Sequence, residues 1–388
     1  MKAAVLKELA EGEKRVAAVP ATVEKMVKAG MDVCLEAEAG LASGFQDREY
    51  REAGAAVAPS PDGALEGADV VLKVQKPGGD ELERIPQGCV LIAYGLRAGT
   101  DLSQKLRARR ITALSLDLLP RIARAQSMDV LSSMANIAGY KAVLLGAGAL
   151  GKFFPMLMTA AGTVLPAKVL VLGAGVAGLQ AIATARRLGA VVTGFDIRPA
   201  VKEQVESLGA RFLAATLEEP RSATALPARG RSGEEAEHLE DAKGYAKEVS
   251  ADAARREQAA IAQELRATDV CITTALVPGK KAPTLVTAEM VKGMRMGSVI
   301  VDLAAEQGGN CELTEPGKEI VKHGVTILGP INLVSAMAYQ ASQLYSRNVL
   351  NFLLHVYDKQ GGKIAVDRDD EIVKACLIAH QGELLQPP

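Results

Sequence analysis

The chain has 388 residues, a length that predicts two domains because a single hydrophobic core rarely grows so large. Hydrophobic residues make up 48% and charged residues 23%, and the formal net charge of −1 argues against nucleic acid as a partner. The charged N-terminus is unlike a signal peptide, and no apolar run reaches the roughly 18 residues of a membrane span. The five cysteines show no metal-ligand spacing and predict reduced, mostly buried thiols.

Residues 1–137 alternate short apolar runs with helical segments, which predicts a first α/β domain. The apolar runs lie at 1–7, 32–36, 69–74, 90–94 and 111–117. This alternation is typical of a doubly wound parallel sheet, which binds its ligands at the carboxyl ends of the strands.

A dense polar segment, residues 121–140, follows the last of these strands. It contains Arg121, Gln126, Asp129 and Ser132. The segment follows a strand's carboxyl end, so these side chains are candidates for a binding site. A solvated connection before a helix is the alternative, and the spacing alone leaves both interpretations open.

Residues 141–165 are apolar and predict one long helix that links the two domains. The segment contains Gly146, Gly148 and Gly151, which have the GxGxxG spacing of a dinucleotide motif. No acidic residue follows at the end of a next strand, so we expect these glycines to serve close helix packing.

A second GxGxxG, formed by Gly173, Gly175 and Gly178, stands in the required context of strand, turn and helix. Gly173 allows the tight turn, Gly175 lets the backbone approach a pyrophosphate, and Gly178 lets helix and strand pack closely. The pyrophosphate would bind the free N–H groups at the start of the following helix. The next apolar run ends at Asp196, whose carboxylate would accept hydrogen bonds from the adenosine ribose.

The acidic Asp196 favours NAD(H) over NADP(H), because a 2′-phosphate would meet like charge. The positively charged Arg198, two residues later, is the one neighbour that does not fit this preference. Further apolar runs at 269–274, 299–303 and 325–328 extend the second sheet, and the loop after the first of them is placed to cover the nucleotide. The candidate nucleotide contacts in these segments are Gly173, Gly175, Val176, Ala177, Gly178, Asp196, Ile197, Arg198, Thr274, Ala275 and Leu276.

The sequence therefore predicts an α/β fold with two Rossmann-like, doubly wound parallel-sheet domains. The first comprises residues 1–137 and is completed by a largely helical segment, 330–388. The second, residues 138–329, is the NAD(H)-binding domain, entered by the long linking helix.

Four motifs together resemble the NAD(H)-binding subunit of proton-translocating nicotinamide nucleotide transhydrogenase, and the likeness spans essentially the whole chain. They are RIARAQSMDVLSS from Arg121, the Gly173 fingerprint, Gly244-Tyr-Ala-Lys-Glu248, and VDLAAEQGGN at Val301–Asn310. The resemblance implies that the chain binds NADH and passes hydride directly to NADP⁺ held on a separate NADP(H)-binding subunit. A membrane proton-channel subunit would couple this transfer to proton movement.

The resemblance also implies roles for individual residues. Arg121, Asp129 and Ser132 would orient the dihydronicotinamide, and Gln126 would reach toward the partner's NADP(H). Two further cofactor contacts, Tyr245 and Lys247, would belong to a mobile loop that closes over the nucleotide; the segment 220–237 before it is longer than the family pattern. We expect a homodimer, peripheral on the cytoplasmic face of the membrane, as a separately encoded subunit.

The chemistry of the residues agrees with this resemblance. Hydride transfer between two nicotinamide rings needs alignment and exclusion of water, with no acid or base. None of the four histidines stands in a catalytic spacing.

Alanine dehydrogenase, a related family, is the alternative enzyme. Arg15 and Lys73 resemble its carboxylate-binding cations, but YGLRAG at 94–99 lacks its histidine, and Glu306 stands where that family has a catalytic aspartate. Without the histidine, proton transfer at the substrate carbon loses its acid–base partner. A nucleotide-binding sensor without turnover is a third class, but it leaves the 121–132 cluster unexplained.

Overall fold

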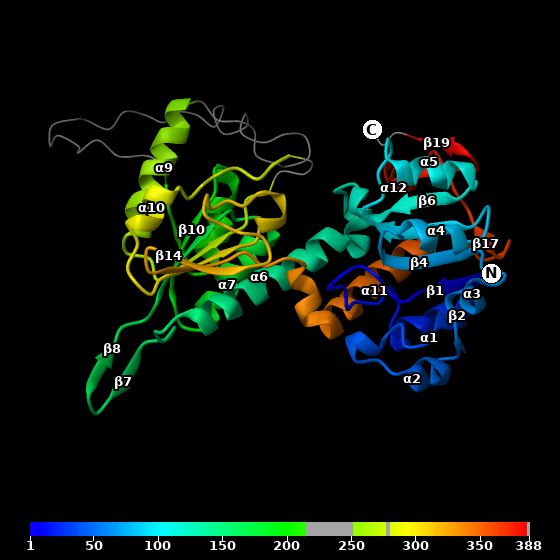
Figure 1. Cartoon of the computed structure of the whole chain (residues 1–388), viewed down its shortest axis with the longest axis horizontal. Helices are drawn as coiled ribbons and strands as arrows, with labels where there is room; N and C mark the ends of the chain where they lie inside the picture. Colours follow the sequence, from blue (N-terminus) through cyan, green and yellow to red (C-terminus); the bar gives the residue numbers. More distant parts are fainter. Residues whose placement is uncertain (215–250, 277–279, 386–388) are drawn as a thin grey trace. The chain divides into compact units, whose positions relative to one another are not determined.

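The computed structural model describes residues 1–214, 251–276 and 280–385 (Figure 1). The chain divides into two compact units. The first unit comprises Met1–Met134 and Val334–Pro388, and the second comprises Ala135–Leu333.

The sheet of the first unit has the strand order β19-β18-β6-β5-β4-β1-β2-β3. Strands β1 to β6 are parallel, whereas β18 and β19 run antiparallel at one edge. The strands are β1 (Lys2–Val5), β2 (Asp32–Glu36), β3 (Ala56–Ala58), β4 (Val70–Gln75), β5 (Val90–Tyr94), β6 (Thr112–Ser115), β18 (Leu377–His380) and β19 (Glu383–Leu384). The helices are α1 (Pro20–Lys28), α2 (Asp47–Glu52), α3 (Pro61–Leu65), α4 (Gly79–Arg84), α5 (Asp101–Ala108), α11 (Ala338–Val356) and α12 (Glu371–Cys376), with 3₁₀ turns η1 (Leu41–Ser43), η2 (Leu116–Leu118) and η3 (Ala123–Met128).

The sheet of the second unit has the order β11-β10-β9-β12-β13-β15-β14, parallel except for β14. Its strands are β9 (Lys168–Leu172), β10 (Val191–Phe195), β11 (Arg211–Phe212), β12 (Val270–Thr273), β13 (Val299–Asp302), β14 (Glu319–Lys322) and β15 (Val325–Leu328). Its helices are α7 (Val176–Arg187), α8 (Lys202–Ser207), α9 (Ala251–Leu265) and α10 (Ala288–Lys292), with 3₁₀ turns η4 (Pro199–Val201) and η5 (Ala305–Gln307). Helix α6 (Val130–Ala149) and the 3₁₀ turn η6 (Leu333–Met337) cross the boundaries between the units.

Both sheets are buried on two faces, because alternate residues of each central strand enter different cores. In β1, Ala3 and Val5 face one apolar cluster while Ala4 faces another. In β9, Val169 and Val171 alternate with Leu170 and Leu172 in the same way. These observations confirm the predicted α/β fold of two Rossmann-like sheets.

In each sheet the chain reverses its direction of winding between two neighbouring strands. These strands are β1 and β4 in the first unit and β9 and β12 in the second. The carboxyl ends of such a pair form the edge at which open α/β sheets bind ligands.

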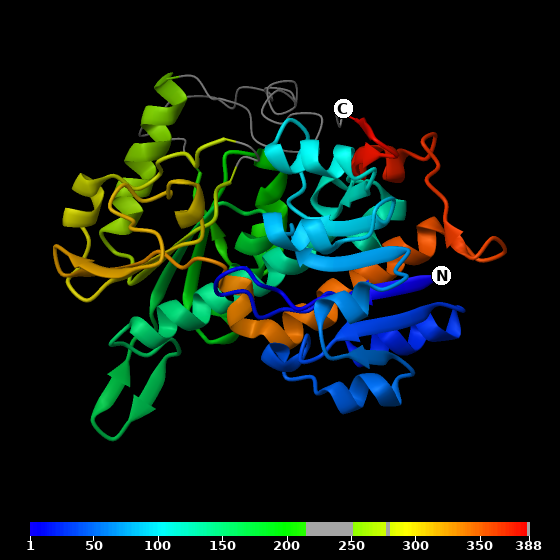
Figure 2. The same ribbon diagram turned by 45° about the vertical axis from the view of Figure 1, so that its right-hand side comes forward.

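The single helix predicted over 141–165 is wrong. Helix α6 ends at Ala149, and β7 (Leu157–Thr159) pairs antiparallel with β8 (Gly162–Val164). Figure 2 shows this hairpin extending away from the sheet of the second unit. Pro155 precedes it and cannot continue a helix.

One further expectation is corrected. Residues 330–388 are only partly helical, since they also form β18, β19 and the hairpin of β16 (Tyr357–Asp358) and β17 (Lys363–Ile364). Helix α6 is the one described helix that, by length and composition alone, is apolar enough to cross a membrane, although polar residues such as Ser132, Asn136 and Lys141 interrupt its apolar residues. One of its glycines, Gly139, packs closely inside the second unit: a Cβ there would lie 2.1 Å from the Ala177 carbonyl oxygen.

The glycines of the first GxGxxG differ in their surroundings. A Cβ on Gly146 would lie 2.8 Å from a methyl of Val270, so the expected close packing is confirmed there. A Cβ on Gly148 or Gly151 would meet nothing within 4 Å, so close packing does not explain those two.

Candidate functional site

The turn after β9 has the geometry of a dinucleotide-binding turn. Gly173 has a φ of +97°, which favours glycine, and a Cβ there would lie 2.7 Å from the Thr274 hydroxyl. A Cβ on Gly178 would lie 1.8 Å from the Gly173 carbonyl oxygen, so α7 approaches the turn too closely for any side chain. A Cβ on Gly175 would meet nothing within 4 Å. The backbone at the start of α7, before Val176 and Ala177, is therefore open to a ligand.

Asp196 follows β10 and lies beside this turn. Its carboxylate accepts a hydrogen bond from the Ala174 N–H at 2.7 Å, which joins the carboxyl ends of β9 and β10. The backbone N–H of Arg198 donates to the same carboxylate at 2.9 Å, and the Arg198 guanidinium donates two more bonds, at 2.9 and 3.0 Å. Ile197 lies between the two and is half-buried.

The loop after β12 is held against the turn. The Thr274 hydroxyl donates to the Gly173 carbonyl oxygen at 2.9 Å, and Leu276 is exposed. Ala275 is bound on both sides by Asn310, which accepts from its N–H at 3.0 Å and donates to its carbonyl at 2.9 Å. Asn310 also donates to the Pro283 carbonyl at 2.8 Å.

Asn310 and Asp302 support the site although neither was among the predicted site residues. Asp302 is fully buried and accepts hydrogen bonds from two hydroxyls, of Thr273 and Thr314, and from the N–H groups of Ala304 and Cys311. It thereby fixes the segment that carries Asn310. The available signal was an acidic residue at the end of a buried strand, followed by Gly308-Gly309-Asn310.

Other expected nucleotide contacts lie outside the described residues. These are Tyr245 and Lys247, together with the long segment 220–237.

The candidate catalytic residues lie in the first unit, around η3 and the start of α6. Asp129 directly precedes α6, and its carboxylate accepts hydrogen bonds from the N–H of Ser132 at 2.9 Å and its hydroxyl at 2.5 Å. This arrangement caps the helix. Arg121 and Gln126 are exposed.

Two asparagines of α11 support this segment and were missed from the sequence. The side-chain amides of Asn348 and Asn351 both donate to the Ser127 carbonyl at 2.9 Å. The backbone next to Gln126 is therefore anchored although the Gln126 side chain is exposed.

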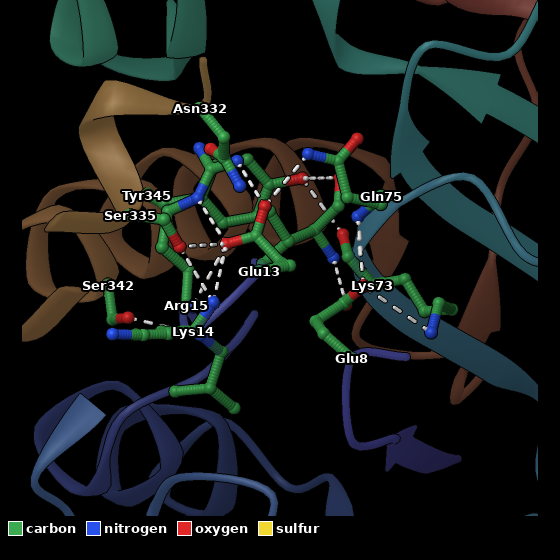
Figure 3. A network of polar contacts seen from close by, with 12 residues as sticks. Glu8, Glu13, Lys14, Arg15, Lys73, Gln75, Asn332, Ser335, Ser342 and Tyr345 are labelled. Carbon is green, nitrogen blue, oxygen red and sulfur yellow. Dashed lines mark hydrogen bonds and ion pairs between the residues drawn. The ribbon is translucent and has the colours of Figure 1, made fainter. Parts of the chain in front are cut away.

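The corresponding edge of the first sheet is filled with buried ion pairs (Figure 3). The Arg15 guanidinium donates two hydrogen bonds to the Glu13 carboxylate, at 2.8 and 2.6 Å, and the Gln75 amide donates another at 2.8 Å. Lys73 pairs with Glu8 at 3.5 Å and with Glu81. We call Glu8, Glu13, Arg15, Lys73 and Gln75 the β1–β4 cluster.

Charge compensation within this cluster is reflected in its pKa values. Burial alone would raise the pKa of Glu13, but the hydrogen bonds and charge of Arg15 hold that pKa at about 2. Burial raises the pKa of Glu8, although the Lys73 charge opposes this. Arg15 and Lys73 resemble the carboxylate-binding cations of alanine dehydrogenase. In this chain both are already paired with carboxylates of the chain itself.

Comparisons with known proteins agree with these features. The N-terminal domain model of "Alanine dehydrogenase/PNT" matches residues 4–138, and its C-terminal domain model matches residues 142–387. The chain is 47% identical to an NAD(P) transhydrogenase α subunit of Rhodospirillum rubrum over 100% of this chain and 98% of that protein. An alanine dehydrogenase of Halomonas elongata is 31% identical, over 99% and 94% of the two chains.

A crystal structure of transhydrogenase from Sinorhizobium meliloti superposes with a TM-score of 0.85 at 42% identity, covering 99% of this chain and 100% of that one. The transhydrogenase relatives are thus more similar to this chain than the alanine dehydrogenase is. With both domain models matched and this order of similarity, the chain belongs to the alanine dehydrogenase/PNT family, as a homologue of the transhydrogenase α subunit.

Proposed function

We propose that the chain is the NAD(H)-binding subunit of a proton-translocating transhydrogenase. It binds NADH at the turn between β9 and α7 and passes hydride directly to NADP⁺ on a separate subunit. The observation that carries the proposal is the combination of an open helix start at Gly175 with a carboxylate at Asp196. The first accommodates a pyrophosphate and the second accepts ribose hydroxyls.

The expected cofactor fits these residues. The lack of a side chain at Gly175 leaves the backbone bare where phosphate oxygens would approach, and Asn310 fixes the loop at Ala275. Bound NADH supplies the hydride. The chain's role is to bind, to orient the ring and to exclude water.

We assign the orienting role to Arg121, Gln126, Asp129 and Ser132. The Asp129–Ser132 cap and the Ser127 anchor hold the backbone of this segment. The exposed Gln126 is available to a nucleotide held by another subunit. Transfer between two nicotinamide rings requires no histidine in this arrangement.

The assembly belongs to the proposal. We infer a homodimer, a membrane proton-channel subunit and an NADP(H)-binding subunit as partners, with this subunit peripheral on the cytoplasmic face of the membrane. The hairpin β7–β8 supports the homodimer, because Met156, Met158 and nearby Leu165 are exposed apolar side chains, Met158 to 81%. Sedimentation equilibrium of Met158→Glu tests this point: a monomer is expected, and an unchanged dimer removes the hairpin from the interface.

The decisive experiment compares two reactions of the purified chain. The chain is mixed first with NAD⁺ and L-alanine, and then with NADH, a chromophoric NADP⁺ analogue and the NADP(H)-binding subunit. We expect no reduction of NAD⁺ by alanine, and rapid reduction of the analogue only when the partner is present. Alanine-dependent reduction would make the chain an alanine dehydrogenase, and NADH binding with neither reaction would make it a sensor.

A further inference from the structure

The carboxylate expected to bind ribose is already fully engaged. Both oxygens of Asp196 accept hydrogen bonds, from Ala174, from the Arg198 backbone and from the Arg198 guanidinium. The Arg198 side chain approaches with two nitrogens, one to each oxygen. Such a bidentate pair occupies the lone pairs that ribose hydroxyls would use.

The two components of this interaction differ in their consequences for a ligand. The backbone bonds from Ala174 and Arg198 belong to the turn and shape it. The guanidinium bonds are made by a flexible side chain that can rotate away. The side chain of Arg198 keeps 18% of its surface exposed, against 8% for Asp196, so the arginine lies on the solvent side of the pair.

We propose that Arg198 is a competitor of the nucleotide: its guanidinium covers the Asp196 carboxylate in the free subunit and must leave it when the adenosine ribose binds. The proposal rests on the proposed function, because it takes Asp196 as the ribose-binding group. It gives Arg198 a role opposite to that of a cofactor contact. Removing the guanidinium then strengthens NADH binding.

The same pair bears on the choice between NADH and NADPH. A second carboxylate, Glu257 on α9, lies close enough for electrostatic coupling: burial and then the Asp196 charge raise the pKa of Glu257. A 2′-phosphate at this position therefore meets two acidic groups, whose repulsion the Arg198 cation partly offsets. Loss of the cation should leave NADPH less well tolerated while NADH gains.

The test is the affinity of the full chain for NADH and NADPH, measured by calorimetry for the wild type and for Arg198→Ala. When the guanidinium holds the carboxylate in most free molecules, the apparent affinity for NADH falls in proportion to the fraction of molecules whose carboxylate is open. For a partly exposed ion pair this is roughly a fivefold loss of affinity. We expect Arg198→Ala to lower the Kd for NADH by about this factor and to raise the ratio of NADPH to NADH Kd. Arg198→Gln, which keeps one donor, should lie between, and it carries the test if the alanine variant does not fold.

A matched control removes a positive charge nearby without touching Asp196. Lys202 is exposed at the start of α8, so Lys202→Ala reports the general effect of charge on nucleotide affinity. Its expected change in the NADH Kd is less than twofold. An equal gain in Lys202→Ala and Arg198→Ala would overturn the proposal.

A double-mutant cycle isolates the pair. In the background of Asp196→Asn, removal of Arg198 should no longer improve NADH binding, because the carboxylate it covers is gone. Weaker NADH binding in Arg198→Ala would overturn the proposal and make Arg198 a nucleotide contact. A wild-type chain that binds no NADH would instead overturn the proposed function, so the two failures are distinguishable.

Discussion

The strand order reverses in both units, but the residues at the carboxyl ends of the two central strands differ between them. In the second unit the edge between β9 and β12 is lined by glycine turns and an open helix start. In the first unit the edge between β1 and β4 is filled by the β1–β4 cluster of buried ion pairs. The turn after β9 leaves the start of α7 open to a ligand, whereas the space at the β1–β4 edge is occupied by buried charges that pair with one another.

This difference shows that the winding of the sheet creates a place for a ligand, and the side chains decide whether a ligand enters. Strand order predicts both edges equally well, yet among the described residues buried ion pairs fill the β1–β4 edge, whereas the turn at Gly173 leaves the start of α7 open. The contrast is testable by removing the charge from one edge and the ribose carboxylate from the other.

The largest effect is expected in the first unit, for Glu13→Gln. The substitution leaves the buried Arg15 without its carboxylate and should lower the free energy of unfolding by about 3–5 kcal/mol. Urea denaturation measures the change. Glu24→Gln, which breaks an exposed pair with Lys28, is the matched control and should leave the midpoint unchanged.

The same residue predicts a dependence on pH. The folded pKa of Glu13, about 2, lies below its ordinary value of 4.5. Its contribution to stability is therefore complete above pH 4.5 and is lost as the pH falls toward 2. Acid unfolding curves of the wild type and Glu13→Gln should converge across that interval, and parallel curves would contradict the assignment.

The next largest effect is expected at Gln126, where a substitution should change the alignment of the two nicotinamide rings without changing NADH binding. Gln126→Asn shortens the side chain by one methylene, and a displacement of this size is expected to slow hydride transfer about 100-fold. The Kd for NADH should not change. Stopped-flow transfer to partner-bound NADP⁺ analogue measures the rate, with Gln104→Asn on α5 as an exposed control; equal rates in the two variants would remove Gln126 from the site.

A smaller effect is expected at the open edge of the second unit. Asp196→Ala should weaken NADH binding by about 1–3 kcal/mol, through loss of charged hydrogen bonds to the ribose. Equilibrium dialysis gives the Kd. Unaltered affinity would show that the ribose binds elsewhere, and the contrast between the two edges would then lose its functional meaning.

The smallest effect is expected for Gly148→Ala, which compares the first GxGxxG motif with the second. Gly148→Ala replaces an exposed glycine of α6 and should raise the free energy of unfolding by up to about 1 kcal/mol. Gly178→Ala should have the opposite sign, because its Cβ would lie 1.8 Å from a backbone oxygen. Thermal unfolding of both variants tests whether Gly178 excludes a side chain while Gly148 tolerates one.

The sequence predicted the elements that depend on local patterns. Apolar runs such as Val169–Leu172 became strands, and the turn at Gly173 formed as its glycine spacing indicates. The hairpin β7–β8 was missed because its apolar residues are exposed, so periodicity alone does not distinguish it from a helix. Pro155 was the overlooked signal.

The site was harder to predict than the fold. Asp196 was identified because it stands at a fixed place after the glycine turn. Its pairing with Arg198 depends on side-chain rotation, which no spacing encodes. Asn310 binds Ala275 from a loop 35 residues away in the chain, and such long-range hydrogen bonds leave no local pattern.

The pairing of β18 with β6 has a consequence for how the protein is made. Strand β18 begins at Leu377, so the ribosome synthesises the whole second unit before the first unit receives this strand. Until then the edge of β6 has unpaired N–H and C=O groups, which favour association with other chains. The second unit, encoded in one continuous stretch, can fold during that interval, whereas the first unit is completed last although its synthesis starts first.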